Sequence, residues 1–389
     1  MQLLKSTTSG AEMKSRPHHR LSVGIAGFSL IELMVGMVIA LIASLAIVQV
    51  LSTFEDQKRS TTAGSEAQEN GLIALAELEQ TIHNAGACLI NAATFDCATT
   101  YTYLDSANGG AGGINPDFSL VPLSITDGGT TGSDTITVRI GSNLIGAVPT
   151  TISKDMPQES SEFYVKNPGV FQIGDLDIVM SGGNCTVQNV TAVQSNAGKI
   201  QHNPGNAAPN NPPANVQHAQ NWPGYLTGST ALSLGTITAN TFSISNNKLQ
   251  LVSTNINSNI SAAAAVLSKD IVSLQAQYGV AAATPVGSQN VSNWVNATGS
   301  WVTPSNADIK RIKAVRIVIV ARSGKKEATN VTSTCTNNAG TNNGPCAWQD
   351  SAADPAPLID LSSDSDWQRY RYKVYQTVIP LRNVIWANV

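Results

Sequence analysis

The sequence predicts an α+β protein in which a long N-terminal helix, membrane-spanning in its first half, packs on an antiparallel β-sheet with long loop insertions. Two observations predict this fold. Residues 28–54 contain one charged side chain, Glu32, and the 22 residues from Leu33 to Phe54 contain none. Much of the remaining chain consists of short segments that alternate polar and apolar residues and end at Gly, Pro or Asn, as β-strands do.

The apolar run at residues 28–54 is long enough to cross a bilayer, because about 20 apolar residues suffice for a transmembrane helix. An ordinary signal anchor, or a secretory signal peptide cleaved after Ser44–Ala46, would also begin with such a run. Glu32 argues against both alternatives, because a carboxylate in an apolar span is costly and neither alternative uses it.

The helix is predicted to continue through residues 55–87. Apolar residues recur there at three- and four-residue spacing and predict one buried stripe: Leu72, Leu75, Leu78 and Ile82. Residues 84–86 (Asn-Ala-Gly) form a plausible stop. Position 49 is Gln, so no proline kink is expected there, and Gly64 and Gly71 are the weaker points of the helix.

The body of the protein, residues 88–389, is predicted to be β-rich. The expected strands share polar–apolar alternation or a short apolar run: 134–140, 162–166, 175–180, 185–193, 236–244, 248–253, 310–321 and 370–381. Residues 310–321 are the most apolar and should form a central strand beside 370–381. A hairpin turn at Asn246-Asn247 is expected to join 236–244 to 248–253. Residues 262–277 are rich in Ala and Leu and predict a short helix. Residues 196–228 and 329–356 are predicted to be long exposed loops.

Composition argues against several function classes. The net charge is −3 and 13% of residues are charged, so no nucleic-acid partner is expected. The chain contains no HExxH, GxSxG or P-loop motif and no CxxC pair, so we expect no enzyme, no cofactor and no metal site. Asp360, Asp364 and Asp366 could hold a hard cation, but a solvated acidic loop is the preferred interpretation.

Five cysteines predict disulfides if the body folds in an oxidising compartment. The pairs nearest in sequence are Cys88–Cys97 and Cys335–Cys346, which would leave Cys185 unpaired. Spacing alone does not fix connectivity, so pairing through Cys185 remains an alternative.

The run from Gly27 to Val35, G-F-S-L-I-E-L-M-V, resembles the cleavage and methylation site of type IV prepilins. The resemblance implies that a prepilin peptidase cuts after Gly27 and N-methylates Phe28, and that Glu32, the fifth mature residue, acts in assembly. Residues 1–27 would then be the leader, with Met13 as an alternative start. Basic residues outnumber acidic ones in this leader, which keeps it cytoplasmic and places the body in the periplasm.

Three segments of the C-terminal half resemble the PilW branch of minor pilins: 272–280, 315–323 and 378–383. This resemblance implies a pilin-like fold and a minor pilin of a type IV pilus, acting in assembly initiation or at the tip. The implied partners are other minor pilins, the major pilin, the prepilin peptidase and the inner membrane, from which the chain would pass into the pilus. A pseudopilin of type II secretion and a membrane-anchored binding or adhesion module are the alternatives.

Overall fold

The computed structural model describes residues 27, 29–90, 94–108, 113, 115, 118–129, 131–143, 148–205, 208–348 and 351–387. Two compact units make up the chain. Met1–Lys58 holds the N-terminal half of helix α1 (Leu30–His83), and Arg59–Val389 holds the rest of α1 together with the strands. A long apolar helix followed by a mostly antiparallel β body confirms the predicted α+β class.

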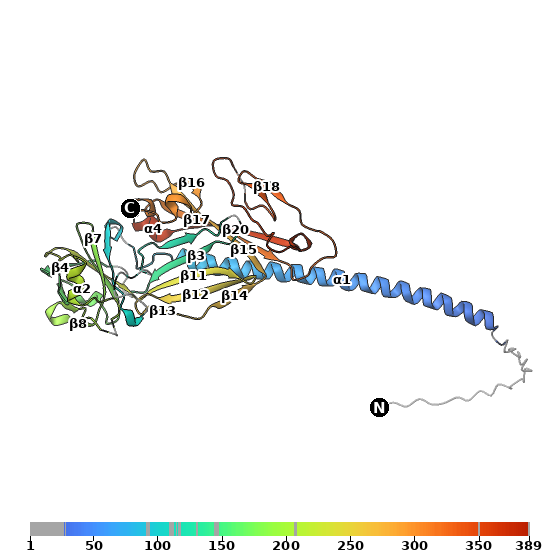
Figure 1. Cartoon of the computed structure of the whole chain (residues 1–389), viewed down its shortest axis with the longest axis horizontal. Coiled ribbons are helices and arrows are strands. Elements are labelled where there is room, and N and C mark those ends of the chain that lie inside the picture. Colours follow the sequence, from blue (N-terminus) through green and yellow to red (C-terminus); the bar gives the residue numbers. More distant parts are fainter. Residues whose placement is uncertain are drawn as a thin grey trace, which may run out of the picture. The chain divides into compact units, whose positions relative to one another are not determined.

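An eight-stranded sheet forms one part of the body. Its strands, in spatial order, are β1 (Thr99–Tyr101), β7 (Asn184–Asn189), β6 (Leu176–Ser181), β10 (Thr230–Gly235), β4 (Thr150–Lys154), β5 (Glu162–Val165), β9 (Lys199–Gln201) and β8 (Ala192–Gln194). Only the β1–β7 pair among these described strands is parallel. Figure 1 shows β4, β7, β8 and α2 (Ala214–Ala219) gathered at one end of the body.

Two further sheets lie beside the second half of α1. One contains β13 (Ile260–Ser261), β12 (Lys248–Asn255), β11 (Ile237–Ser245), β3 (Thr135–Gly141) and β2 (Leu123–Thr126), with β14 (Ala265–Lys269) also paired to β12. The other contains β16 (Val291–Val295), β15 (Ile271–Ala281), β17 (Ile312–Arg322) and β20 (Tyr372–Pro380). Strands β18 (Cys335–Asn337) and β19 (Gly340–Asn342) form a separate hairpin.

Short helices complete the described elements. They are α3 (Asn306–Ile309), α4 (Arg382–Ala387), and the 3₁₀ turns η1 (Thr94–Asp96), η2 (Ser106–Asn108), η3 (Pro168–Val170), η4 (Ser195–Ala197), η5 (Gly299–Trp301) and η6 (Trp367–Arg369).

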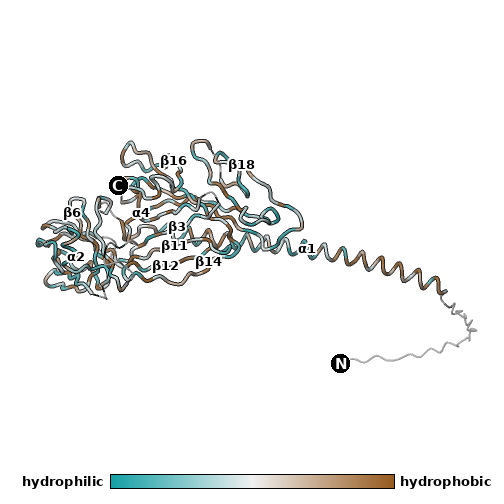
Figure 2. Tube along the Cα trace, viewed as in Figure 1, coloured by the Kyte–Doolittle hydropathy of each residue, from teal (hydrophilic) through white to brown (hydrophobic). Residues whose placement is uncertain are grey.

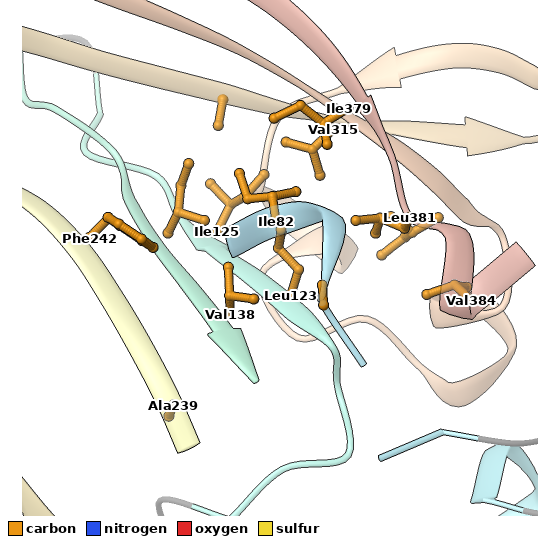
Figure 3. Close-up of a cluster of buried hydrophobic side chains, with 14 of the residues drawn as sticks. Ile82, Leu123, Ile125, Val138, Ala239, Phe242, Val315, Ile379, Leu381 and Val384 are labelled. Carbon is orange, nitrogen blue, oxygen red and sulfur yellow. The ribbon is translucent and has the colours of Figure 1, made fainter. Parts of the chain in front are cut away.

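The main core lies where the end of α1 meets these sheets. In Figure 3, Ile82 of α1 lies in the middle of a cluster to which β2, β3, β11, β17, β20 and α4 contribute side chains, among them Ile125, Phe242, Val315 and Ile379. Burial of a large aliphatic or aromatic side chain stabilises the fold by about 1.5–3 kcal/mol. This cluster therefore joins the second half of α1 to both neighbouring sheets.

The central strand β17 is buried on both faces, which explains its continuous apolar sequence. Val315, Ile317 and Ile319 face the main core. Val318 and Val320 face a separate cluster that contains Ala347, Ile359, Leu361 and Trp367. The predicted pairing of this strand with 370–381 is confirmed as β17–β20, and β20 ends at Pro380 as expected.

The hairpin predicted at Asn246-Asn247 is also confirmed. Both asparagines adopt positive φ angles (50° and 56°), and β11 pairs with β12 on either side of them. Two consecutive positive φ angles match a type I′ turn, whose twist fits that of the two antiparallel strands it joins.

The helix predicted at residues 262–277 is wrong. This segment forms β14 and most of β15, separated by Asp270 at a φ of 57°. Alanine favours a helix only weakly, and burial of β15 between two strands outweighs that preference.

Candidate functional site

The first half of α1 is the most conspicuous exposed surface. From Leu30 to Phe54, its large apolar side chains are between 54% (Val35) and 78% (Leu30) exposed. Figure 2 shows this half of the helix as a hydrophobic stretch. Among the described residues, α1 is the one helix long and apolar enough to cross a membrane, with a mean hydropathy of 2.6 over the apolar window. Such a helix could anchor the chain in a membrane.

The single carboxylate of the apolar segment lies at its start. Glu32 occupies the first turn of α1 and is exposed, and the N–H of Leu33 donates to the carbonyl of Ser29 at 3.1 Å. A carboxylate at a helix N-terminus gains about 0.3–1 kcal/mol from the helix dipole. Gly27 precedes the helix and is exposed, with no heavy atom within 4 Å of the position a Cβ would take. Phe28, expected to carry the N-methyl group, and residues 1–26 of the expected leader lie outside the described residues.

The second half of α1 packs on the body through small residues. The buried positions follow four- and three-residue spacing: Ala63, Ala67, Gly71, Ala74, Leu78 and Ile82. The predicted stripe is correct for Leu78 and Ile82, and Leu75 packs against the core. It is wrong for Leu72, which is 50% exposed. The sequence pattern did not predict the buried alanines and Gly71, because small residues add little to a hydrophobic periodicity. Their small size lets the helix approach the sheet closely.

Side-chain hydrogen bonds to this half of α1 come from several parts of the body. The Tyr375 hydroxyl donates to the carbonyl of Gln68 at 3.1 Å, and the Ser268 hydroxyl donates to the carbonyl of Asn70 at 2.8 Å. The Asn383 amide donates to the carbonyl of Ala85 at 2.9 Å, just beyond the helix end at His83. These contacts fix the register of the helix on β20, β14 and α4.

A carboxylate joins the same helix to the body. The Ser60 hydroxyl donates to Glu327 at 2.8 Å, and the Arg371 guanidinium donates to the same carboxylate at 3.0 Å. These two hydrogen bonds lower the pKa of Glu327 below its ordinary value. Glu327 therefore stays ionised where the helix enters the body.

The disulfides differ in part from expectation. Cys335–Cys346 is present, with Cα atoms 5.7 Å apart. The expected Cys88–Cys97 pair is wrong, because Cys97 is bonded to Cys185 and Cys88 is a free thiol. The reason is the parallel β1–β7 pair: Thr100 lies opposite Cys185, which brings Cys97, two residues before β1, to a Cα distance of 5.5 Å. Burial raises the pKa of the Cys88 thiol.

The segment 196–228 is not the exposed loop that was expected. It contains β9 and α2, and it buries Trp222 and Tyr225. Two of its asparagines, Asn210 and Asn211, are buried and hydrogen-bonded: the Asn210 amide donates to Asn189 and to the carbonyl of Asn257, both at 3.0 Å. Asparagine-rich sequence indicates a loop only when these side chains face water, and here the buried Asn210 connects the end of β7 to the residues after β12 instead.

The three C-terminal aspartates do not gather around a common point. Asp364 pairs with Arg322 at 2.8 Å, and Asp366 bonds to Lys326. Asp360 accepts hydrogen bonds from the backbone of Ser362 and the amide of Asn343. Within the part of the chain that the structure describes, no group of three or more His, Cys, Asp or Glu residues could hold a metal ion.

These features define a class: a protein in which an apolar helix long enough to cross a membrane continues into a disulfide-bonded, mostly antiparallel β body. Residues 237–383 match the family of type IV pilus-assembly protein W, known as PilW. The match runs from β11 into α4 and covers all three segments that resemble this branch in sequence. It supports a PilW-type protein of type IV pili and implies a part in pilus assembly. No curated protein and no solved structure matches the chain.

Proposed function

We propose that this chain is a minor pilin that acts in the initiation of type IV pilus assembly, at the tip of the filament or both. The observation that carries the proposal is the exposed apolar half of α1, with Glu32 in its first turn, on a body of the PilW type. The family match favours the pilus over the type II secretion alternative.

The helix would have two successive environments. Residues 28–54 would first anchor the subunit in the inner membrane, after peptidase cleavage behind Gly27, and later pack among the helices of the filament. Both environments cover the apolar side chains that the folded body leaves exposed. The basic residues before Gly27 would hold the leader in the cytoplasm, and the body would face the periplasm. An oxidising periplasm suits the two disulfides.

Glu32 would act between subunits. A carboxylate that is buried among apolar side chains is costly, so a partner of opposite charge is advantageous once the helix packs among other helices. The N-methylated ammonium of Phe28 on a neighbouring subunit is the partner we propose, since a cleaved N-terminus would place a cation at the same end of each packed helix as Glu32. Pairing of this kind would select correctly staggered neighbours.

The size of the body supports the proposal that this subunit is present in few copies per filament. Residues 59–389 form one compact unit that carries an eight-stranded sheet beyond the sheets packed on α1. A subunit of this size would crowd lateral neighbours in a densely repeating shaft. A tip position leaves one side without a neighbour and tolerates the bulk.

Quantitative mass spectrometry of sheared filaments tests the proposal. The chain should be present at far less than one copy per major subunit, and its N-terminus should be a methylated Phe28. Deletion of the gene should reduce filament number much more than filament diameter. A chain that is the most abundant filament protein contradicts the minor role, and an uncut chain or a start at Ile47 contradicts the prepilin assignment.

A further inference from the structure

A cavity of about 700 Å³ opens between the β15–β16 connection and the residues that lead from η5 into β17. Part of its wall is apolar, from Ala282, Ala283, Val286 and Ala307. Val286 is 93% exposed, so the body itself leaves an apolar side chain at this site facing solvent.

The polar wall of the cavity is cationic. Lys310, Arg311 and Lys313 line it together with one acid, Asp308. Two of the cations are already paired: Arg311 contacts Asp308 at 2.8 Å, and Lys310 contacts Asp96 at 3.0 Å.

Lys313 differs from the other two cations. It lies on β17, only 2% of its surface is exposed, and it lines the cavity. Within the described residues, the ion pairs of the cavity wall involve Lys310 and Arg311 and not Lys313, whose carbonyl accepts from the N–H of Leu381. Burial alone lowers its pKa. A cation that burial destabilises in this way is stabilised when a carboxylate reaches it.

We propose that this cavity receives a carboxylate side chain carried on an apolar segment of a neighbouring pilus subunit, with Lys313 as the counter-ion. Charge complementarity selects the carboxylate, and the alanine and valine wall selects the apolar flank. The naming of a pilus subunit as the source rests on the function proposed above. The carboxylate site itself rests on Lys313 and the cavity.

The test uses the full-length chain in detergent micelles, labelled with [ε-¹³C]lysine, and two short probes. The probes are acetyl-Val-Glu-Val-amide and its glutamine analogue, with inorganic phosphate as a third ligand. The glutamate peptide should shift the Lys313 signal and raise its pKa toward the ordinary lysine value, because an adjacent carboxylate favours the charged form. The glutamine peptide and phosphate should leave the signal in place.

Two variants test whether the glutamate peptide binds at Lys313. Lys313→Met keeps most of the side-chain volume and should weaken binding of the glutamate peptide about tenfold or more, as expected for a hydrogen bond to a charged group. Lys269→Met, on the exposed face of β14, should leave binding unchanged. The titration of Lys313 in the unsubstituted chain gives the answer even where Lys313→Met fails to fold.

Equal binding of both peptides, or no shift of the Lys313 signal at millimolar glutamate peptide, overturns the proposal. Displacement of the peptide by phosphate would instead assign a small-anion site and also overturns it. The outcome is independent of the filament experiment. Peptide binding by a chain that is absent from filaments would retain the carboxylate site and reject only the pilus as its source.

Discussion

Gly71 is expected to be the least replaceable position of α1 within the body. A Cβ built on Gly71 would lie 2.2 Å from Cε2 and 2.5 Å from Cδ2 of Tyr375. Carbon atoms pack at about 3.5–4.0 Å, so the tyrosine ring would have to withdraw by more than 1 Å. That movement would also strain the hydrogen bond from the Tyr375 hydroxyl to Gln68.

The expected change in the free energy of unfolding for Gly71→Ala is the sum of one stabilising and two destabilising contributions. Alanine in place of a helical glycine stabilises by about 0.5–1 kcal/mol. Overpacking costs about 1–3 kcal/mol, and loss of the hydrogen bond adds about 0.5–1.5 kcal/mol. Gly71→Ala should therefore lower the free energy of unfolding by about 1–3 kcal/mol. Gly64→Ala is the matched control in the same helix: nothing lies within 4 Å of its Cβ position, so it should stabilise the protein slightly.

Guanidinium unfolding of the full-length chain in detergent, followed by tryptophan fluorescence, measures both variants. A double-mutant cycle with Tyr375→Ala isolates the contact, because Gly71→Ala should become neutral or stabilising once the ring is absent. Equal stability of Gly71→Ala and Gly64→Ala would refute the reasoning.

Three further predictions concern single side chains. Glu32→Val should leave the chain cleaved and membrane-bound but poorly incorporated into filaments, whereas Glu55→Val should incorporate normally; normal incorporation of Glu32→Val would reduce Glu32 to a helix-dipole contact. Cys185→Ser should destabilise the body by about 2–5 kcal/mol and Cys88→Ser by much less, as judged by denaturant unfolding and non-reducing peptide mapping, since only Cys185 closes a long loop. Asp177 is fully buried and neither carboxylate oxygen has a hydrogen-bond partner among the described residues, so burial raises its pKa well above 3.8. The folded state then binds more protons than the unfolded state above pH 3.8, so stability falls as pH rises toward the folded pKa, and Asp177→Asn should raise stability at pH 7 more than at pH 4; an equal change at both pH values would contradict this.

The sequence predicted those elements whose burial leaves a local pattern. Strands β3 and β11 alternate because one face packs on the core, and β17 is apolar throughout because both faces are covered. The N-terminal helix was predicted from one long apolar run at residues 28–54 that contains a single charge. In each case the information lies within one continuous segment of the chain.

The remaining features depend on contacts between distant segments. Cys97 meets Cys185 because β1 adds in parallel to β7, and no local spacing contains that pairing. The sequence pattern indicated Gly71 as a weak point of the helix. Its missing side chain in fact makes room for the ring of Tyr375, which is 304 residues away in the sequence. Lys313 lies within an apolar strand, and only the fold shows that it lines a cavity.

The two halves of α1 therefore depend on different physics. The first half presents large apolar side chains that the body leaves uncovered, and cover by lipid or by other helices would stabilise it. The second half buries three alanines, Gly71, Leu78 and Ile82, and it is held by core packing at its end and by hydrogen bonds from Tyr375, Ser268 and Asn383. Hydrogen bonds and close packing prevent the second half of α1 from sliding along the body. Apolar contacts made by the first half are non-directional and would not fix its position. A subunit that exchanges one apolar environment for another can thus change the cover of its first half without loosening the helix from the body.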